Sequence, residues 1–228
     1  MDKIREIDKI REIDKIGKDL CYFQLTFVLI DYILRLLIGN KARWYQIHVI
    51  GNSMVLYYIL KDTIQLYIDP LSNYKELDNS YASYIILTMH VHHIIFFKLN
   101  RIDYFHHILF ILLGVLPTII FVNTNQIYFG YVACSGIPGF IEYSTMTLYK
   151  NNYIDLFKQK KIVMFIYNFI RYPMCIYGFT INLLSRNYNK ILLKDNIYIS
   201  LYINFLLYVN GSIFNLMSIK SYINNLNN

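Results

Sequence analysis

The feature that most constrains this chain is a succession of long apolar runs separated by short polar intervals. The first run, residues 20–39, is long enough to cross a ~30 Å hydrocarbon core at about 1.5 Å of rise per residue. Six further runs follow at 44–68, 81–97, 104–122, 127–149, 162–184 and 197–219. The pattern predicts an all-α integral membrane protein with six to seven transmembrane helices, the second and third runs being the weakest candidates.

Composition supports a membrane location. Hydrophobic residues make up 56% of the 228 residues and charged residues only 16%, whereas soluble domains carry about a quarter charged residues. The net charge of +7 comes mainly from Lys and Arg in polar intervals, where they would face anionic headgroups. We therefore expect membrane lipids, and no nucleic acid, as partners. Cys21, Cys134 and Cys175 lack paired spacing, which predicts neither a disulfide framework nor a zinc site.

The chain divides into four segments. Residues 1–19 form a charged extension in which Asp-Lys-Ile-Arg-Glu-Ile occurs twice in succession, a pattern typical of a salt-bridged helix or of a disordered segment. Residues 20–39 form the first transmembrane helix, residues 40–220 a multi-helix membrane domain, and residues 221–228 a polar tail. The extension lacks the cleavage pattern of a signal peptide, and we expect it to be dispensable for chemistry.

The first run contains two charges. Asp31 and Arg35 stand at i and i+4, so on a helix they share a face and can pair. Pairing lowers the cost of each charge inside the membrane. The spacing therefore predicts an ion pair within this helix.

Ionisable residues gather at the start of the fourth run. Asp103, His106 and His107 stand at i, i+3 and i+4, so a helix places them on one face at the edge of the hydrocarbon layer. Ionisable groups are costly there and usually functional. An imidazole with an ordinary pKa of about 6.5 suits proton transfer, and a nearby carboxylate would orient it. These three are the candidate catalytic residues; the alternative is interfacial histidines bonded to neighbouring helices or headgroups.

Polar residues also lie inside later runs. The fifth run is interrupted by Gly136-Ile137-Pro138-Gly139 and continues with Glu142, Ser144 and Thr145. Arg171 lies about halfway along the sixth run, where an arginine needs a partner, water or a ligand acid. We interpret Glu142 and Arg171, with the two hydroxyls as donors, as a clamp for a lipid headgroup or carboxyl. A structural ion pair between the two helices is an equal alternative.

The third run ends in a histidine-rich segment, His90, His92 and His93, close to the double histidine that follows the next connector. Only His48 lies elsewhere in the sequence. The spacing differs from the His-x-x-His-His boxes of membrane di-iron oxygenases, and the ligands are too few. We therefore favour an aqueous rim of polar side chains over a metal site and assign no metal ligands.

Four short motifs occur in order along the chain: Lys41-Ala-Arg-Trp44, Asp103-Tyr-Phe-His-His107, Glu142-Tyr-Ser-Thr145 and Arg171. Together they resemble the TLC-domain family, which includes ceramide synthases and translocating-chain-associating membrane proteins. Residues 135–147 lack the downstream His-Asp pair of the synthases, so the resemblance is closer to the non-synthase branch.

The resemblance implies a TLC-type bundle with a lipid-binding cavity, acting on membrane lipid composition in the endoplasmic reticulum or another endomembrane. Trp44 is then an interfacial anchor and lipid contact. If the protein is an enzyme, the resemblance implies acyl transfer from acyl-CoA, as co-substrate, to a lipid amine or hydroxyl. His106 or His107 would be the base and Asp103 its orienter. The alternatives are a non-catalytic protein for lipid binding, sensing or trafficking and, disfavoured by histidine number, a metal-dependent oxidase or desaturase.

Overall fold

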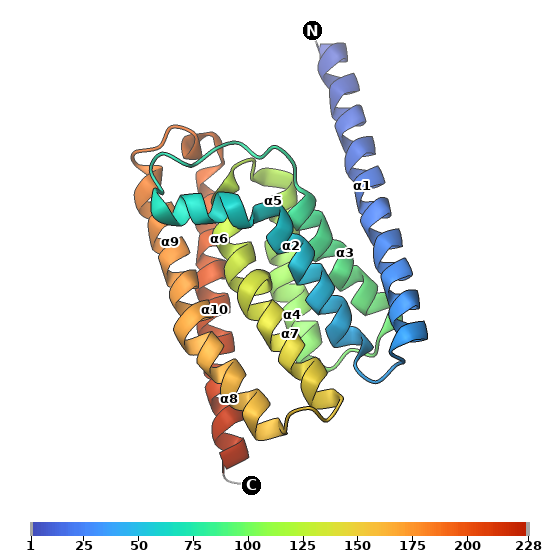
Figure 1. The fold of residues 1–228 in the computed structure, drawn as a ribbon. Helices are drawn as coiled ribbons and strands as arrows, with labels where there is room; N and C mark the ends of the chain where they lie inside the picture. The colour runs from blue at the N-terminus through green and yellow to red at the C-terminus, as the bar shows by residue number, and fades with distance from the viewer. Residues whose placement is uncertain (1, 227–228) are drawn as a thin grey trace.

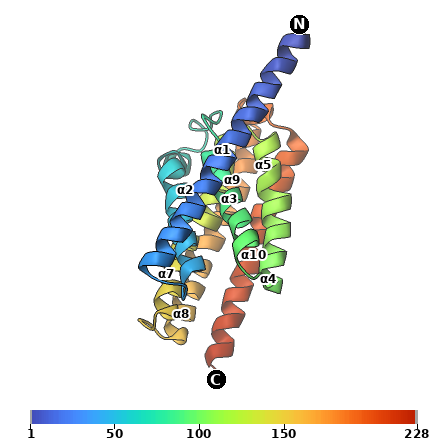
Figure 2. The same cartoon turned by 90° about the vertical axis from the view of Figure 1, so that its right-hand side faces the viewer.

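The computed structural model of the chain describes residues 2–226. Within this range the chain is helical except for connecting loops and one isolated antiparallel bridge between Glu76 and Thr124. Most of the helices lie roughly side by side in one elongated bundle, while the C-terminal part of α2 (cyan) runs across it. The N-terminal end of α1 extends beyond the other helices (Figures 1 and 2).

The described residues form seven helical rods that correspond to the seven apolar runs. The single-element rods are α1 (Asp2–Leu37), α2 (Arg43–Ile68), α3 (Tyr81–Phe96) and α10 (Ile197–Leu226). The fourth rod is α4 (Arg101–His106), η1 (His107–Val115) and α5 (Leu116–Phe121). The fifth is η2 (Asn125–Ile127), α6 (Tyr128–Tyr131), η3 (Val132–Gly136) and α7 (Ile137–Lys150). The sixth is α8 (Leu156–Ile166), η4 (Tyr167–Arg171) and α9 (Tyr172–Arg186), followed by the short η5 (Leu192–Lys194).

Four helical stretches are long and apolar enough to cross a membrane, in agreement with an integral membrane protein. They are Ile13–Leu37, Arg101–Phe121, Leu156–Arg186 and Ile197–Leu226. By contrast α3 has 16 residues, which at ~1.5 Å each is shorter than a ~30 Å core. The seven-span count therefore stays a prediction. The charged repeat is helical as the N-terminal part of α1, ahead of the first of these stretches.

Three rods contain a π-helical segment, and each segment is followed by proline two residues later. Pro117 follows η1, Pro138 follows η3 and Pro173 follows η4. Proline cannot donate to the carbonyl four residues earlier and clashes with it, so the preceding turn widens. The freed carbonyl of Leu113 accepts a hydrogen bond from the Tyr202 hydroxyl at 3.0 Å. The predicted interruption at residues 136–139 is therefore a widened turn in a continuing helix.

The Asp31 carboxylate pairs across helices and not with Arg35. Its oxygens lie 2.7 Å from Arg43 Nε and 3.3 Å from His92 Nε2. Arg35 is exposed on the outside of α1. The predicted Asp31–Arg35 ion pair is therefore wrong. The turn after α1 brings the start of α2 back beside Asp31, where Arg43 approaches the carboxylate directly. This ion pair fastens α1 to α2 and α3.

Asp195, before α10, organises the opposite end of the bundle. Its carboxylate accepts hydrogen bonds from the Asn123 backbone N–H and from the side chains of Thr124 and Gln126. Gln126 in turn accepts from the Ser200 hydroxyl at 2.9 Å. These contacts join the connector before α6 to α10 and close this end of the bundle with polar groups.

Candidate functional site

A chamber of about 190 Å³ lies among α2, α3, α4, α7, η4 and α10. This volume is more than ten times the ~10–15 Å³ that one ordered water requires, so the chamber has room for a polyatomic group. The polar side chains that line it include His48, Asn52, His90, His106, Glu142 and Arg171. Two of the rods have a widened turn at this level, since Cys134 and Ser135 of the lining belong to η3 and Tyr167 and Arg171 belong to η4.

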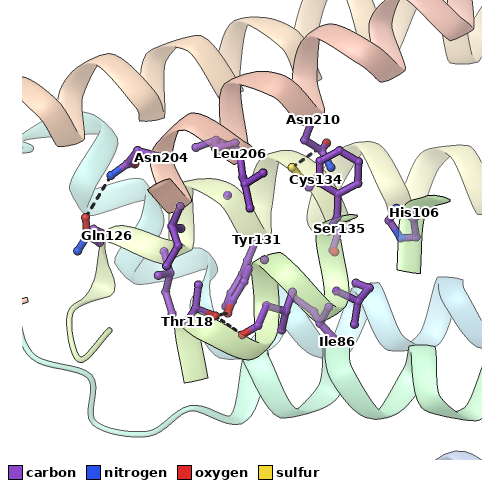
Figure 3. Close-up of a pocket in the computed structure, with 18 of the residues that line it drawn as sticks. Ile86, His106, Thr118, Gln126, Tyr131, Cys134, Ser135, Asn204, Leu206 and Asn210 are labelled. Carbon is purple, nitrogen blue, oxygen red and sulfur yellow. Dashed lines mark hydrogen bonds between the residues drawn. The ribbon is translucent and has the colours of Figure 1, made fainter. Parts of the chain in front are cut away.

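A second cavity of about 110 Å³ adjoins the chamber and is mostly apolar. The two cavities share four lining residues, His106, Cys134, Ser135 and Arg171. Figure 3 shows Gln126 and Asn204 at one end of this cavity and His106 at the other, with aliphatic and aromatic side chains between. The polar chamber and the apolar cavity beside α10 therefore lie next to each other and share part of their walls.

Five of the six histidines lie close together. His48 is far from the others in sequence, and only the tertiary structure brings it beside them. His90 Nε2 lies 3.0 Å from His106 Nε2, and His93 Nδ1 lies 3.3 Å from His107 Nε2. The ring centroids of His48 and His90 are 5.6 Å apart. The sixth histidine is His92, which faces Asp31 on the other side of α3. The predicted aqueous rim is wrong, because these histidines form two hydrogen-bonded pairs plus His48 and four of the five, His48, His90, His93 and His107, are buried.

The hydrogen bonds of His90 define which nitrogen of His106 is free. A carbonyl oxygen only accepts, so His90 Nδ1 donates to the Ile86 carbonyl at 2.7 Å. Neutral His90 then presents an Nε2 lone pair, and His106 Nε2 donates its proton to it. His106 Nδ1 consequently carries the remaining lone pair and has no hydrogen-bond partner within residues 2–226. This assignment leaves His106 Nδ1 as an unused proton acceptor in the wall of both cavities.

Asp103 lies in the chamber wall, but its hydrogen bonds belong to the start of α4. Its carboxylate accepts from the Asn100 backbone N–H at 2.8 Å, while Asn100 Oδ1 accepts from the Asp103 N–H at 3.1 Å. This reciprocal arrangement is a capping box, which stabilises a helix N-terminus. The bond that orients His106 comes from His90 instead of Asp103.

Glu142 and Arg171 are joined through a tyrosine that the sequence interpretation missed. The Tyr167 hydroxyl donates to Glu142 and accepts from Arg171 Nη1 at 2.7 Å. Arg171 Nη2 donates to Asn210 Oδ1 at 2.7 Å, and the guanidinium also lies over the Phe214 ring. Arg171 Nε has no hydrogen-bond partner among the described residues. The charge of Arg171 is therefore countered through Tyr167, and one of its donors is still free.

The remaining predicted lipid contacts, and the predicted catalytic residue His107, lie outside the chamber. Thr145 donates to the Glu142 backbone carbonyl at 2.8 Å, so its hydroxyl is used within its own helix. Ser144 lines a separate surface groove beside Gln46. Trp44 stacks on His93 with ring centroids 3.4 Å apart, and His107 lines neither of the two cavities. These residues support the histidine pairs or face elsewhere.

Asn52 is the most informative residue that sequence reasoning left out of the site. It is only 1% exposed and lines the chamber, yet neither its Oδ1 nor its Nδ2 has a hydrogen-bond partner in the described part of the chain. A buried amide without partners costs about 1–3 kcal/mol, so its presence needs a reason. His48 and Asn52 stand at i and i+4 on α2, a spacing that could have indicated a shared polar face.

Comparison with protein-family models, curated proteins and solved structures finds no match for this chain. Over residues 2–226 no group of three or more His, Cys, Asp or Glu side chains is arranged to hold a metal ion. The site is therefore interpreted from its own geometry.

Proposed function

We propose that this chain is a multi-pass membrane protein that binds a lipid, with the polar end in the chamber and an apolar chain in the adjoining cavity. The observation that carries the proposal is the adjacency of the two spaces, whose walls share His106, Cys134, Ser135 and Arg171. A polar compartment beside an apolar one matches the two halves of a lipid molecule. Polar groups of this kind inside a membrane bundle are costly and usually serve a ligand.

Within this proposal the chain is a TLC-type bundle with seven membrane spans, acting on lipid composition in the endoplasmic reticulum or another endomembrane. The motif order from Trp44 to Arg171 supports the assignment. The correspondence between seven apolar runs and seven helical rods is compatible with it.

The chemistry that the site supports best is acyl transfer from acyl-CoA to a lipid hydroxyl or amine. The oxygen or nitrogen of the lipid hydroxyl or amine forms a bond to the thioester carbonyl carbon, and His106 Nδ1 accepts the proton that this group loses. The carbon–sulfur bond then breaks, and coenzyme A leaves as its thiolate. His90 holds the His106 ring through the 3.0 Å contact and is a positioning residue. His107 Nδ1 also has no hydrogen-bond partner in residues 2–226, but His107 lines neither cavity and is therefore not assigned as the base.

A second candidate is a non-catalytic protein that binds or senses lipids. It is favoured by the capping role of Asp103, which leaves His106 without a carboxylate hydrogen bond in the described structure. A catalytic imidazole is usually oriented by such a group. In this case the same two cavities hold the lipid and no bond is broken.

The test compares His106→Ala with His107→Ala in cells expressing the protein, with lipid profiles measured by mass spectrometry. We expect His106→Ala to abolish any change in profile caused by the wild type, while His107→Ala keeps it. Thermal unfolding of both purified variants shows that each is folded. Equal loss in both folded variants would contradict the assignment of His106 as base. A wild-type profile identical to that of control cells, with lipid copurifying, would favour the non-catalytic protein.

A further inference from the structure

The unused hydrogen-bonding atoms of the chamber define what its occupant must offer. Two of them are donors, Arg171 Nε and Asn52 Nδ2. Two are acceptors, Asn52 Oδ1 and, from the tautomer assigned above, His106 Nδ1. All belong to side chains that line the same 190 Å³ chamber. An occupant that satisfies them must both donate and accept hydrogen bonds.

The charges of the chamber restrict the occupant further. Its lining contains one cationic side chain, Arg171, and two acidic ones, Glu142 and Asp103. Arg171 is already linked to Glu142 through Tyr167. A fully ionised phosphate would supply only acceptors, leave both acceptor atoms of the protein unpaired and meet two carboxylates. An ammonium would supply only donors and leave the Arg171 and Asn52 donors unpaired. Unpaired buried groups of this kind are a strong basis for discrimination between ligands.

From this balance we infer that the chamber binds the uncharged, hydroxyl-bearing head of a neutral lipid such as an acylglycerol. A hydroxyl group donates and accepts at one atom, so a glycerol head with its hydroxyls and ester carbonyl satisfies both kinds of free atom. The inference rests on the proposed lipid binding and names its substrate class. If the protein transfers acyl groups, the hydroxyl that donates to His106 Nδ1 is the one that accepts the acyl group.

Asn52 provides a variant that separates binding from folding. Because its amide is buried without partners, Asn52→Leu removes an uncompensated polar group and keeps a similar volume. We expect this variant to be as stable as the wild type or more stable, as at other sites where function opposes stability. Ser53→Leu is the matched control, since Ser53 is the next residue on α2 and is exposed.

The experiment uses the full chain in detergent micelles and four lipids with the same oleoyl chain or its alkyl equivalent: 1-oleoylglycerol, oleate, oleylamine and oleoyl lysophosphatidate. The fluorescence of Trp44, the single tryptophan, reports binding because its ring centroid lies 3.6 Å from that of His48 in the chamber wall. We expect 1-oleoylglycerol to bind at least tenfold more tightly than the three charged lipids. Asn52→Leu should lose at least tenfold in this affinity, and Ser53→Leu should not change it.

Three outcomes would overturn the inference in distinguishable ways. Tighter binding of oleylamine, oleate or lysophosphatidate than of 1-oleoylglycerol would refute the neutral head and leave lipid binding intact. No saturable change with any of the four lipids would refute the proposed function as well. Equal affinities of folded Asn52→Leu and wild type for 1-oleoylglycerol would show that the lipid does not occupy the chamber.

Discussion

Two polar clusters lie inside this bundle, and they differ in what their charged groups contact. In the α1 cluster, formed by Asp31, Arg43 and His92, each charge meets an opposite or titratable group directly, at 2.7 and 3.3 Å. In the chamber, the charges of Glu142 and Arg171 are joined only through Tyr167. The first cluster closes a helix interface, whereas the second surrounds a cavity.

The difference teaches how to separate structural from functional polar groups in a membrane protein. In the α1 cluster the charges of Asp31 and Arg43 offset each other directly at 2.7 Å, even though Asp31 Oδ1, Arg43 Nε and His92 Nε2 make no well-aligned hydrogen bond among the described residues. The chamber keeps free donors and acceptors beside about 190 Å³ of space. Sequence alone offers the same residue types in both places, so burial and partners decide the interpretation.

The largest expected effect is on the α1 cluster. Asp31→Asn leaves Arg43 without its carboxylate, and we expect the free energy of unfolding to fall by about 3 kcal/mol, the range for a broken buried ion pair. Denaturant titration in mixed micelles measures this. Arg35→Ala is the control and should change stability by less than about 0.5 kcal/mol because Arg35 is exposed. A similar loss in both variants would show that Asp31 pairs within its own helix.

A double-mutant cycle tests whether the Glu142–Arg171 link is only structural. Glu142→Gln alone should cost about 2 kcal/mol, since the buried Arg171 loses its counter-charge. Glu142→Gln should also abolish binding of 1-oleoylglycerol. Combining it with Arg171→Gln should restore part of the stability but should not restore binding. If the double variant recovers both stability and binding, the Glu142–Arg171 link is a structural ion pair. The proposed difference between the chamber and the α1 cluster would then be contradicted.

Tyr167→Phe should have a smaller effect. It removes a hydroxyl that donates to Glu142 and accepts from Arg171, and we expect a loss of about 1–2 kcal/mol in the free energy of unfolding. Tyr177→Phe is the control, because its hydroxyl makes one 3.2 Å bond to the Tyr67 carbonyl. Thermal unfolding of the two variants side by side measures the difference. Equal losses would show that the Tyr167 hydroxyl has no special role in coupling the charges.

The smallest effect is a change in how readily a thiol reagent reaches Cys134, with no change in stability. Cys134 lines both cavities and is partly exposed, whereas Cys175, 3.9 Å away at Sγ, is fully buried. A small polar thiol reagent should therefore modify Cys134 and the exposed Cys21 but spare Cys175. Bound 1-oleoylglycerol should slow modification of Cys134 only. Peptide mass spectrometry resolves the three sites, and unmodified Cys134 would indicate that the chamber is closed to such reagents.

Sequence by itself determined the helical architecture and the positions of the three widened turns. Apolar runs of sufficient length specify helices whatever their neighbours, and all seven runs are helical rods in residues 2–226. Pro117, Pro138 and Pro173 determine the widened turns locally, because each removes a backbone donor. The clustering of His106 with the third run also followed from one short connector.

Only the tertiary structure decided which polar side chains meet. Asp31 had a partner at i+4 in sequence but pairs with Arg43, because the turn between α1 and α2 brings a closer guanidinium. His48 and Asn52 join the chamber because of how α2 packs on α3 and α7, and Tyr167 is recognised only once Glu142 and Arg171 are seen on either side of it. Local periodicity states which face a residue occupies on its helix. It does not state which faces of different helices pack together, and that packing creates the cavity.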